Sequence, residues 1–362
     1  MDTNSPEATA LRDLWDEFPE LETRTKQALR SYARNSQLAL RADWRIWRAW
    51  CGAQNPPLIA LPAAVEDVIA FALACSPTSE AVERGVLYSS GSGSSDEVKS
   101  ASTLRRYLHT LSTVHRLARL PDPIKDPDVE ATRRRITRGR GAQNQKTGLN
   151  RPLLEKLLAF LGDSLWDARA RALLLTAYCT LARSAELVSL TVEDLAVSEQ
   201  GDGYAVIRTS KTDQEGIGSH RYLAIPAIEA LRTWLGAANI THGRVFRRIH
   251  RFGGVTSKAI DPHEVGRIVR AAIRRLPREQ RPVGSFAGHS TRIGAAQDLV
   301  AGGQDLLAVM QAGGWRDPKM PARYTEHLAA MRGGMAQLWG RDRHADVADL
   351  TATIKLASQF VR

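Results

Sequence analysis

Apolar residues recur at helical spacing along most of the chain. Between residues 36 and 53, four of them at i, i+4, i+7 and i+11 share one face of a predicted helix: Leu40, Trp44, Trp47 and Cys51. Further helices are predicted to begin near Pro62, Asp96, Asp126 and Pro152. Residues 168–181 are apolar nearly all round, so we expect that helix to form the buried centre of a second domain.

Two short segments are predicted to be strands. They span residues 204–209 and 221–225, and the polar, glycine-containing stretch between them predicts an antiparallel hairpin. Helical patterns resume after the hairpin. The expected fold is therefore mainly α with a small antiparallel β-sheet.

The pattern also predicts where the domains divide. Residues 140–149 have no periodic apolar positions, so they should link two globular parts. We expect an N-terminal helical domain at 1–139, a basic linker at 140–150, a second domain at 151–340 and a tail at 341–362. A length of 362 residues with 43% hydrophobic residues is enough for two domains, each with its own core.

Composition excludes several protein classes. No apolar run approaches the roughly 18 residues that a membrane span needs, and residues 1–12 lack the apolar segment of a secretory signal. The cysteines Cys51, Cys75 and Cys179 are too few and too widely spaced for a disulfide framework or a zinc cluster. We expect a cytoplasmic protein with no membrane partner.

The net charge of +11 is unevenly distributed. Residues 1–132 hold 15 Lys/Arg against 18 Asp/Glu, residues 133–154 hold 7 against none, and residues 155–362 hold 28 against 21, so the net charges are −3, +7 and +7. A concentrated basic stretch between two globular parts favours a polyanion as partner, nucleic acid above all. Charge alone fits a solvated linker equally well.

Two generic catalytic motifs are incomplete. Residues 263–267 have Arg267 where a zinc protease helix needs its second His, and residues 288–292 have Arg292 where a G-x-S-x-G hydrolase needs its final Gly. No segment resembles a dinucleotide fingerprint or a paired-carboxylate magnesium site. The sequence therefore predicts no metal ion and no cofactor.

A set of phosphate-binding side chains beside a tyrosine remains. Arg183 and Glu186 lie at i and i+3 at a predicted helix start, and so do His289 and Arg292, where the helix N-terminus also favours an anion. Each pair alone is as typical of an ordinary helix surface or cap. Trp315 follows two glycines, and a Tyr stands nine residues after it.

In order and spacing, these motifs together resemble the tyrosine site-specific recombinases, the phage integrase family. The shared elements are Arg-x-x-Glu, a Lys in a β-hairpin, Gly-His-x-x-Arg, Gly-Gly-Trp and the following Tyr. Residues 286–296 and 309–315 carry the most specific likeness, although most members have His at the position of Trp315. Residues 45–51 and 133–138 fit the family's N-terminal domain more weakly, so the likeness covers nearly the whole chain.

The resemblance implies a helical core-binding domain and a catalytic domain that close around DNA as a clamp. It also implies cleavage through a 3′-phosphotyrosyl intermediate and a Holliday junction without ATP or metal. The residue types suit this chemistry: guanidinium forks and an indole N–H neutralise a phosphodiester transition state, an imidazole accepts the nucleophile's proton, and adjacent cations favour a phenolate. The expected catalytic residues are Arg183, Glu186 (orienting), Lys211 (general acid), His289, Arg292, Trp315 and Tyr324 (nucleophile).

DNA contacts are expected from both domains and from the linker. A helix opening at Asp261–Pro262 would present three side chains to a major groove, where the family also places a reading helix: His263, Glu264 and Arg267. The N-terminal and linker candidates, each equally compatible with a solvated face, are Arg34, Arg41, Arg45, Arg105, Arg106, Arg133, Arg134, Arg138 and Arg140.

The expected assembly is a homotetramer on two DNA duplexes that carry an inverted-repeat recombination site. Beyond Tyr324 an apolar stripe at helical spacing comprises Met331, Met335, Leu338 and Trp339. Such stripes usually fold back on their own domain, but the resemblance implies a C-terminal helix buried in the neighbouring protomer. The protein is expected in the cytoplasm, associated with the nucleoid, and no separate arm-binding domain is expected before the first core helix.

Other functions share these motifs. A chromosome- or plasmid-dimer resolvase, a telomere resolvase and a type IB topoisomerase would use the same chemistry. A site-specific DNA-binding protein that has lost catalysis is the alternative from a different class.

Overall fold

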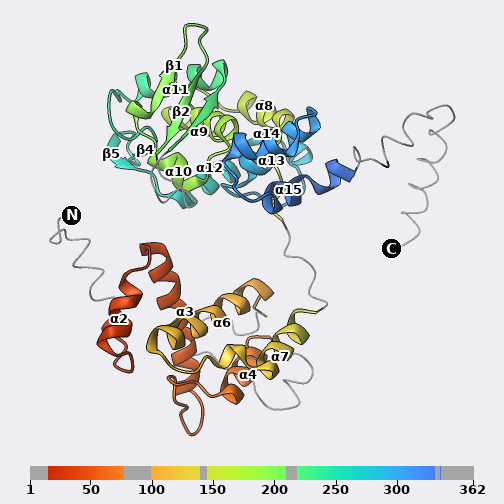
Figure 1. The fold of residues 1–362 in the computed structure, drawn as a ribbon. Coiled ribbons are helices and arrows are strands. Elements are labelled where there is room, and N and C mark those ends of the chain that lie inside the picture. Colours follow the sequence, from red (N-terminus) through yellow and green to blue (C-terminus); the bar gives the residue numbers. More distant parts are fainter. Residues whose placement is uncertain (1–14, 77–98, 139–144, 209–217, 331–334, 336–362) are drawn as a thin grey trace. The chain divides into compact units, whose positions relative to one another are not determined.

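The computed structural model describes residues 15–76, 99–138, 145–208, 218–330 and 335. The chain divides into two compact units, Met1–Asn144 and Gln145–Arg362 (Figure 1). Within the described residues both units are mainly helical, and the strands lie in the second unit. None of the helices in these ranges is both long and apolar enough to cross a lipid bilayer.

The described part of the first unit is built from helices alone. They are α2 (Thr23–Arg30), α3 (Arg34–Gly52), α4 (Val65–Ala74), α6 (Ala101–Ala118), the short 3₁₀ helix η2 (Pro123–Lys125) and α7 (Pro127–Thr137). The apolar face predicted for residues 36–53 is confirmed, since its four side chains on α3 are all buried. Indole and phenyl rings dominate this core: Trp47 stacks on Trp50 at 5.5 Å, and Phe71 of α4 meets Trp47 edge-on at 5.2 Å.

The helix starts in this unit follow local capping chemistry. Asp126 caps α7 as predicted, because its carboxylate accepts a hydrogen bond from the Asp128 N–H at 2.9 Å. The helix predicted to begin near Asp96 is α6, which begins at Ala101, where the Ser100 hydroxyl accepts from the Thr103 N–H. A serine next to the apolar pattern therefore caps this helix, and Asp96 lies outside the described residues.

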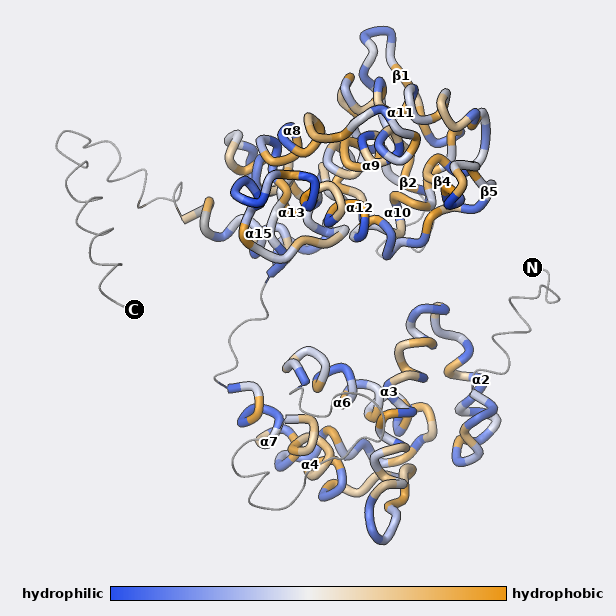
Figure 2. The backbone as a smooth tube through the Cα atoms, turned by 180° about the vertical axis from the view of Figure 1, so that it is seen from behind, coloured by the Kyte–Doolittle hydropathy of each residue, from blue (hydrophilic) through white to orange (hydrophobic). Residues whose placement is uncertain are grey.

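The second unit is organised around one buried helix. Its helices are α8 (Arg151–Ala159), α9 (Leu165–Thr180), α10 (Ser184–Ser189), η3 (Val192–Asp194), α11 (Ile225–Ala237), α12 (Pro262–Arg275), η4 (Arg278–Gln280), α13 (Ser290–Ala301), α14 (Leu306–Gly313) and α15 (Lys319–Ala330). Helix α9 contacts α8, α10, α11, α12 and α13, and Leu173, Leu174 and Ala177 are almost fully buried on it. The predicted central helix is confirmed, and Figure 2 shows apolar stretches along the helices of both units.

Two antiparallel sheets complete the described part of this unit. The predicted hairpin strands are β2 (Gly203–Ile207) and β3 (Ser219–Leu223), paired with Ala205 opposite Arg221, and β1 (Leu195–Val197) adds a third strand on the β2 side. A second sheet pairs β4 (Arg247–Ile249) with β5 (Val255–Ala259). The expectation of a single sheet is corrected by this second one. The sequence gives no clear period-2 signal for it, because β4 has only three residues, two of them Arg, and β5 is largely polar.

The end of the expected linker packs on the second unit. The Thr147 N–H donates to the Ser285 carbonyl at 2.9 Å, and the Leu149 N–H donates to the Ser290 carbonyl at 2.8 Å. Leu149 is fully buried. Its carbonyl oxygen lies so close to Gly294 that a Cβ added to this glycine would be only 2.0 Å from that oxygen. Residues 145–150 therefore hold the first turns of α13, and residues 139–144 lie outside the described part of the chain.

Candidate catalytic site

Arg183 and Glu186 form the first wall of the site. Helix α9 ends at Leu181 in the left-handed conformation (φ 50°), and the chain turns so that Arg183 becomes the N-cap of α10. The Arg183 N–H donates to one Glu186 oxygen at 2.9 Å and its Nη1 donates to the other at 2.5 Å. The pairing predicted from the i, i+3 spacing is present, with Glu186 buried and the Arg183 side chain a quarter exposed.

Helix α13 brings His289 and Arg292 beside that pair. Gly288 lies against α10, since a Cβ added to it would be 2.4 Å from the Ser184 hydroxyl. Arg292, one turn into α13, is 1% exposed, and its Nη1 donates to the Leu181 carbonyl at the end of α9. Its Nη2 is buried and has no hydrogen-bond partner among the described residues. A buried charged donor normally has an acceptor, so this nitrogen points to an anion that completes the site.

The Gly313–Trp315 turn and α15 close the site. The Trp315 ring folds back over Gly313, where a Cβ would be only 1.9 Å from the ring, and the Arg292 guanidinium lies 3.8 Å from the ring centroid. Tyr324 on α15 is 6% exposed, and its ring centroid is 6.2 Å from that of Trp315 and 6.4 Å from that of His289. The structure thus brings together six of the seven predicted catalytic residues, and Lys211 lies outside the described ranges.

A glutamine binds the backbone of the helix that carries Tyr324. Gln297, on α13, donates from Nε2 to the Tyr324 carbonyl at 3.1 Å. Its amide also lies against Gly148, where a Cβ would be 2.2 Å from Oε1. The same side chain therefore touches residue 148 of the packed linker end and the backbone of Tyr324.

Burial controls the protonation of the site. Desolvation, followed by the charges of Arg292 and Arg183, lowers the pKa of His289, so that its imidazole is neutral at pH 7. Desolvation and Arg183 also lower the pKa of Arg292, to about 9, so its guanidinium is still charged at pH 7.

The nearby cations lower the pKa of Tyr324 as expected, but burial outweighs them in the DNA-free chain. Desolvation raises the pKa of Tyr324 more than Arg292, Arg183 and Arg323 lower it. The Tyr324 side chain is therefore a neutral phenol at pH 7 in the DNA-free chain.

Arg221 was not among the predicted residues. It lies on β3, is 7% exposed, and donates from Nη1 to the carbonyls of Gln311 and Ala312 at 2.8 and 2.7 Å. Its charge acts on Arg183, Glu186 and Arg292. Alternation along β3 could have identified Arg221 as an inward-facing charge, but not what it contacts.

The expected DNA-reading residues separate into exposed and paired side chains. Arg34, Arg105, Arg138, His263 and Arg267 are exposed, whereas Arg140 lies outside the described residues. Helix α12 begins at Asp261–Pro262 as predicted, yet the Glu264 carboxylate is engaged by the Asp261 N–H at 3.0 Å.

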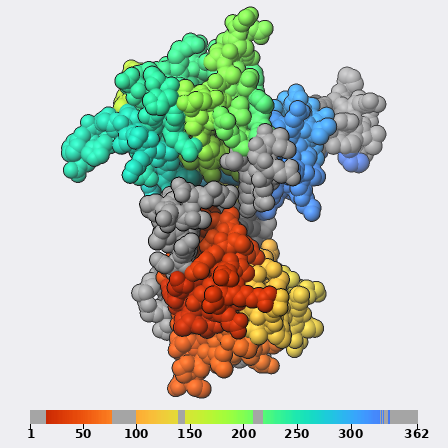
Figure 3. Space-filling model, turned by 60° about the vertical axis from the view of Figure 1, so that its left-hand side comes forward, coloured from red at the N-terminus to blue at the C-terminus, as the bar shows by residue number. Residues whose placement is uncertain are grey.

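The five remaining basic candidates all have acidic partners. Arg41 and Arg45 both pair with Glu17. Arg106 pairs with the buried Asp43 at 3.0 Å, and Arg133 and Arg134 pair with Glu130 at 3.5 and 2.6 Å. Residues of α2 and the start of α3, in red, form much of the face of the first unit in Figure 3.

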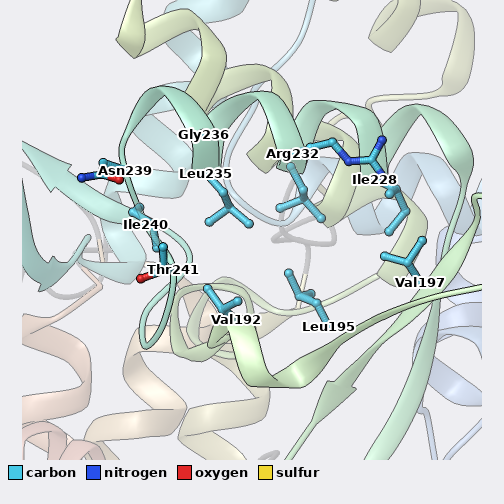
Figure 4. Close-up of a pocket in the computed structure, with 11 residues that line it drawn as sticks. Val192, Leu195, Val197, Ile228, Arg232, Leu235, Gly236, Asn239, Ile240 and Thr241 are labelled. Carbon is cyan, nitrogen blue, oxygen red and sulfur yellow. The ribbon is translucent and has the colours of Figure 1, made fainter.

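The cavity found in the described residues lies apart from this cluster. It has a volume of about 440 Å³ between η3, β1 and α11 and is lined mainly by aliphatic side chains such as Leu195, Leu231 and Leu235 (Figure 4). None of the catalytic candidates lines it. Among the described residues, no group of three or more His, Cys, Asp and Glu side chains is arranged to hold a metal ion.

Comparison with known proteins gives a consistent result. The family model described as phage integrase family matches residues 149–331. Recombinase Cre of Escherichia phage P1 is 26% identical over 311 residues, which is 81% of this chain and 84% of Cre. An integrase/recombinase XerD homolog of Selenomonas ruminantium is 28% identical over 314 residues, 82% of this chain and 83% of the relative.

Solved structures share the fold at low sequence identity. The Tn1549 transposon integrase in complex with circular intermediate DNA has a TM-score of 0.56 at 14% identity, with 96% of this chain and 99% of that chain covered. A lambda integrase dimer bound to a COC' core site has a TM-score of 0.55 at 15% identity, with 92% and 97% covered. The expected mainly helical fold with a small antiparallel sheet is confirmed, and the second sheet is the difference.

Proposed function

The chain belongs to the phage integrase family, the tyrosine recombinases, and we propose that it is a site-specific DNA recombinase. In this proposal it cuts DNA with Tyr324 and rejoins it through a 3′-phosphotyrosyl intermediate and a Holliday junction. The observation that carries the proposal is the buried, unpartnered Nη2 of Arg292 in a cluster with Trp315, His289 and Tyr324.

A phosphodiester supplies the acceptor that this cluster lacks. Arg292 uses Nη1 to hold the Leu181 carbonyl, which leaves Nη2 directed to a non-bridging phosphate oxygen. Glu186 holds Arg183 through one guanidinium nitrogen, and the other donors of Arg183 can bind the second oxygen. The two guanidinium groups then neutralise the charge that accumulates on the phosphorus oxygens in the transition state.

His289 and Tyr324 supply the proton transfer. At pH 7 the Tyr324 phenol is protonated and the His289 imidazole is neutral, so the imidazole can accept the phenol's proton. The phenolic oxygen bonds to phosphorus as the bond to the 5′ oxygen breaks, and that oxygen leaves protonated. Attack by a 5′-hydroxyl reverses these steps on another strand and needs no ATP, since the phosphotyrosine keeps the energy of the phosphodiester.

Lys211 is the proposed general acid, carried over from the family's hairpin lysine. A sulfur in place of the bridging 5′ oxygen leaves without a proton, so Lys211→Ala should recover cleavage on that substrate and not on ordinary DNA. Lys258 on β5 is the control, because Lys258→Ala should cleave both substrates at the parent rate. If Lys211→Ala stays inactive on the sulfur substrate, the role belongs to another group.

Tyr324→Phe provides the direct test of the proposed function. DNA bound by the protein is first selected from a random library, and a nicked duplex of the selected site is then used so that the cleaved end diffuses away. The parent and Tyr222→Phe, an exposed tyrosine on β3, should form a covalent protein–DNA adduct, and Tyr324→Phe should not. Tight binding by a parent that forms no adduct would support the alternative of a DNA-binding protein that has lost catalysis.

The partner in this proposal is double-stranded DNA with an inverted-repeat site, bound by both units in the cytoplasm. Exposed His263 and Arg267 on the first turns of α12 are the proposed base readers. Replacing either by Ala should relax the selected sequence at one position of each half-site. Loss of affinity without any change in the selected sequence would assign them to phosphate contacts instead.

The proposed assembly is a tetramer on two duplexes, linked by the tail at 341–362. Of the apolar stripe predicted just before this tail, at residues 331–339, Met335 is described and exposed, and the rest lies outside the described residues. A chain ending at residue 330 should bind one half-site and lose synapsis. Recombination with normal cooperativity by that shortened chain would show that the tail is not needed between protomers.

A further inference from the structure

Arg221 extends from strand β3 of the three-stranded sheet to the C-terminal end of α14. Its guanidinium is buried, and Nη1 binds the carbonyls of Gln311 and Ala312 in the last turn of α14. The carbonyls that end a helix have no partner within the helix and carry its negative dipole end. A cation from β3 therefore completes the end of α14.

The turn after α14 closes on this guanidinium. The backbone N–H of Trp315 donates to the Met310 carbonyl at 2.9 Å, and the backbone N–H of Gly314 donates to the Gln311 carbonyl at 3.2 Å. The chain therefore reverses within three residues. Gly314 has φ 61°, and a Cβ on it would be 1.8 Å from Nη2 of Arg221. Glycine is required here both for the backbone conformation and for the space that Arg221 occupies.

The same turn sets the position of the Trp315 side chain. From Gly313 the chain runs directly into the indole that lies 3.8 Å over the Arg292 guanidinium and 6.2 Å from the Tyr324 ring. Arg221 thus binds the carbonyls that precede the turn, and the residue that follows the turn carries the indole of the candidate catalytic site. Nη1 of Arg221 donates to two carbonyls of its own chain, which separates its role from that of Arg292, whose buried Nη2 has no hydrogen-bond partner among the described residues.

We propose that Arg221 is a positioning residue, which fixes the Gly313–Trp315 turn so that the Trp315 indole is held against Arg292 and the phosphate. This inference rests on the proposed recombinase function. It predicts that Arg221 acts on strand cleavage through Trp315 and hardly at all on DNA affinity.

A double-mutant cycle tests this role with four full-length proteins: the parent, Arg221→Met, Trp315→Phe and the double variant. Each single change should slow single-turnover cleavage on the order of 10²-fold, the value of one transition-state donor. The double variant should be slower than the worse single variant by no more than about threefold, with Kd for the duplex changed by no more than about threefold. Arg221→Lys should restore part of the rate, whereas Arg278→Met, a change at an exposed arginine in η4, should cleave like the parent.

Gly314→Ala tests the same contact without removing the charge, should Arg221→Met fail to fold. It should slow cleavage and be non-additive with Trp315→Phe, while Gly253→Ala, at another positive φ (91°) with open space around it, should not. Losses that multiply in the double variant, a Kd that weakens as much as cleavage slows, or a Gly314→Ala protein with the parent rate would overturn the role of Arg221. A parent that forms no adduct at all would instead refute the proposed function.

Discussion

Replacing Arg292 by Lys is the change that separates charge from geometry in this site. In the proposed function Arg292 has two directed tasks: Nη1 holds the Leu181 carbonyl, and the buried Nη2, which has no partner among the described residues, binds a phosphate oxygen. Its flat face also lies 3.8 Å from the Trp315 ring. A lysine keeps the positive charge, but one ammonium cannot bind the carbonyl, stack on the indole and reach the phosphate together.

The loss can be worked out from these contacts. One charge-assisted hydrogen bond contributes about 1.5–3 kcal/mol, and a desolvated cation–π contact contributes about 2 kcal/mol. Because the lysine keeps part of each, we expect a net loss of about 3–4 kcal/mol in transition-state stabilisation. At about 1.4 kcal/mol per factor of ten, cleavage should slow by about 10²- to 10³-fold.

The assay is single-turnover cleavage of a nicked half-site at saturating protein, with Kd measured separately at the same salt concentration. Since the charge is retained, Kd for Arg292→Lys should change far less than the cleavage rate. Arg274→Lys, an exposed arginine in the last turn of α12, is the matched control and should cleave like the parent. Cleavage by Arg292→Lys within about fivefold of the parent would refute this account, because a directed donor is worth much more than that.

Three further outcomes are expected. The pKa of His289 is lowered in the folded chain, so the unfolded chain takes up that proton first as the pH falls. The free energy of unfolding in urea should therefore fall more steeply below pH 6.5 in the parent than in His289→Gln. Equal slopes would contradict the burial of a neutral imidazole. Gln297→Leu should slow cleavage by about ten- to a hundredfold, because Tyr324 is displaced when its carbonyl loses this donor, and Kd should not change. Gln280→Leu, a change at an exposed glutamine, is the control. Cleavage at the parent rate by Gln297→Leu would show that Gln297 does not position α15. Tyr178→Phe should lower the unfolding free energy by about 1.5–3 kcal/mol, because the Tyr178 hydroxyl donates to the Asp298 carboxylate at 2.5 Å. A change under about 0.5 kcal/mol would mean that water replaces this hydrogen bond in the variant.

The features that could be predicted from the sequence depend on residues close together in the chain. The Arg183–Glu186 pair, the Asp126 cap of α7 and the start of α12 at Asp261–Pro262 each join residues two or three positions apart. Their geometry is set by the helix itself, whatever surrounds it. The buried faces of α3 and α9 follow for the same reason, since apolar spacing alone determines which side leaves water.

Other features depend on which distant segments the tertiary structure brings together. Glu17 pairs with Arg41 and Arg45 and so occupies two side chains expected on DNA, and Arg221 joins β3 to α14 across some 90 positions of sequence. The same holds for protonation: the order of residues shows cations near Tyr324, but only the packed site shows that desolvation outweighs them and keeps the phenol neutral. Local spacing determines helix geometry over a few residues, whereas burial and long-range ion pairing are properties of the whole packed unit.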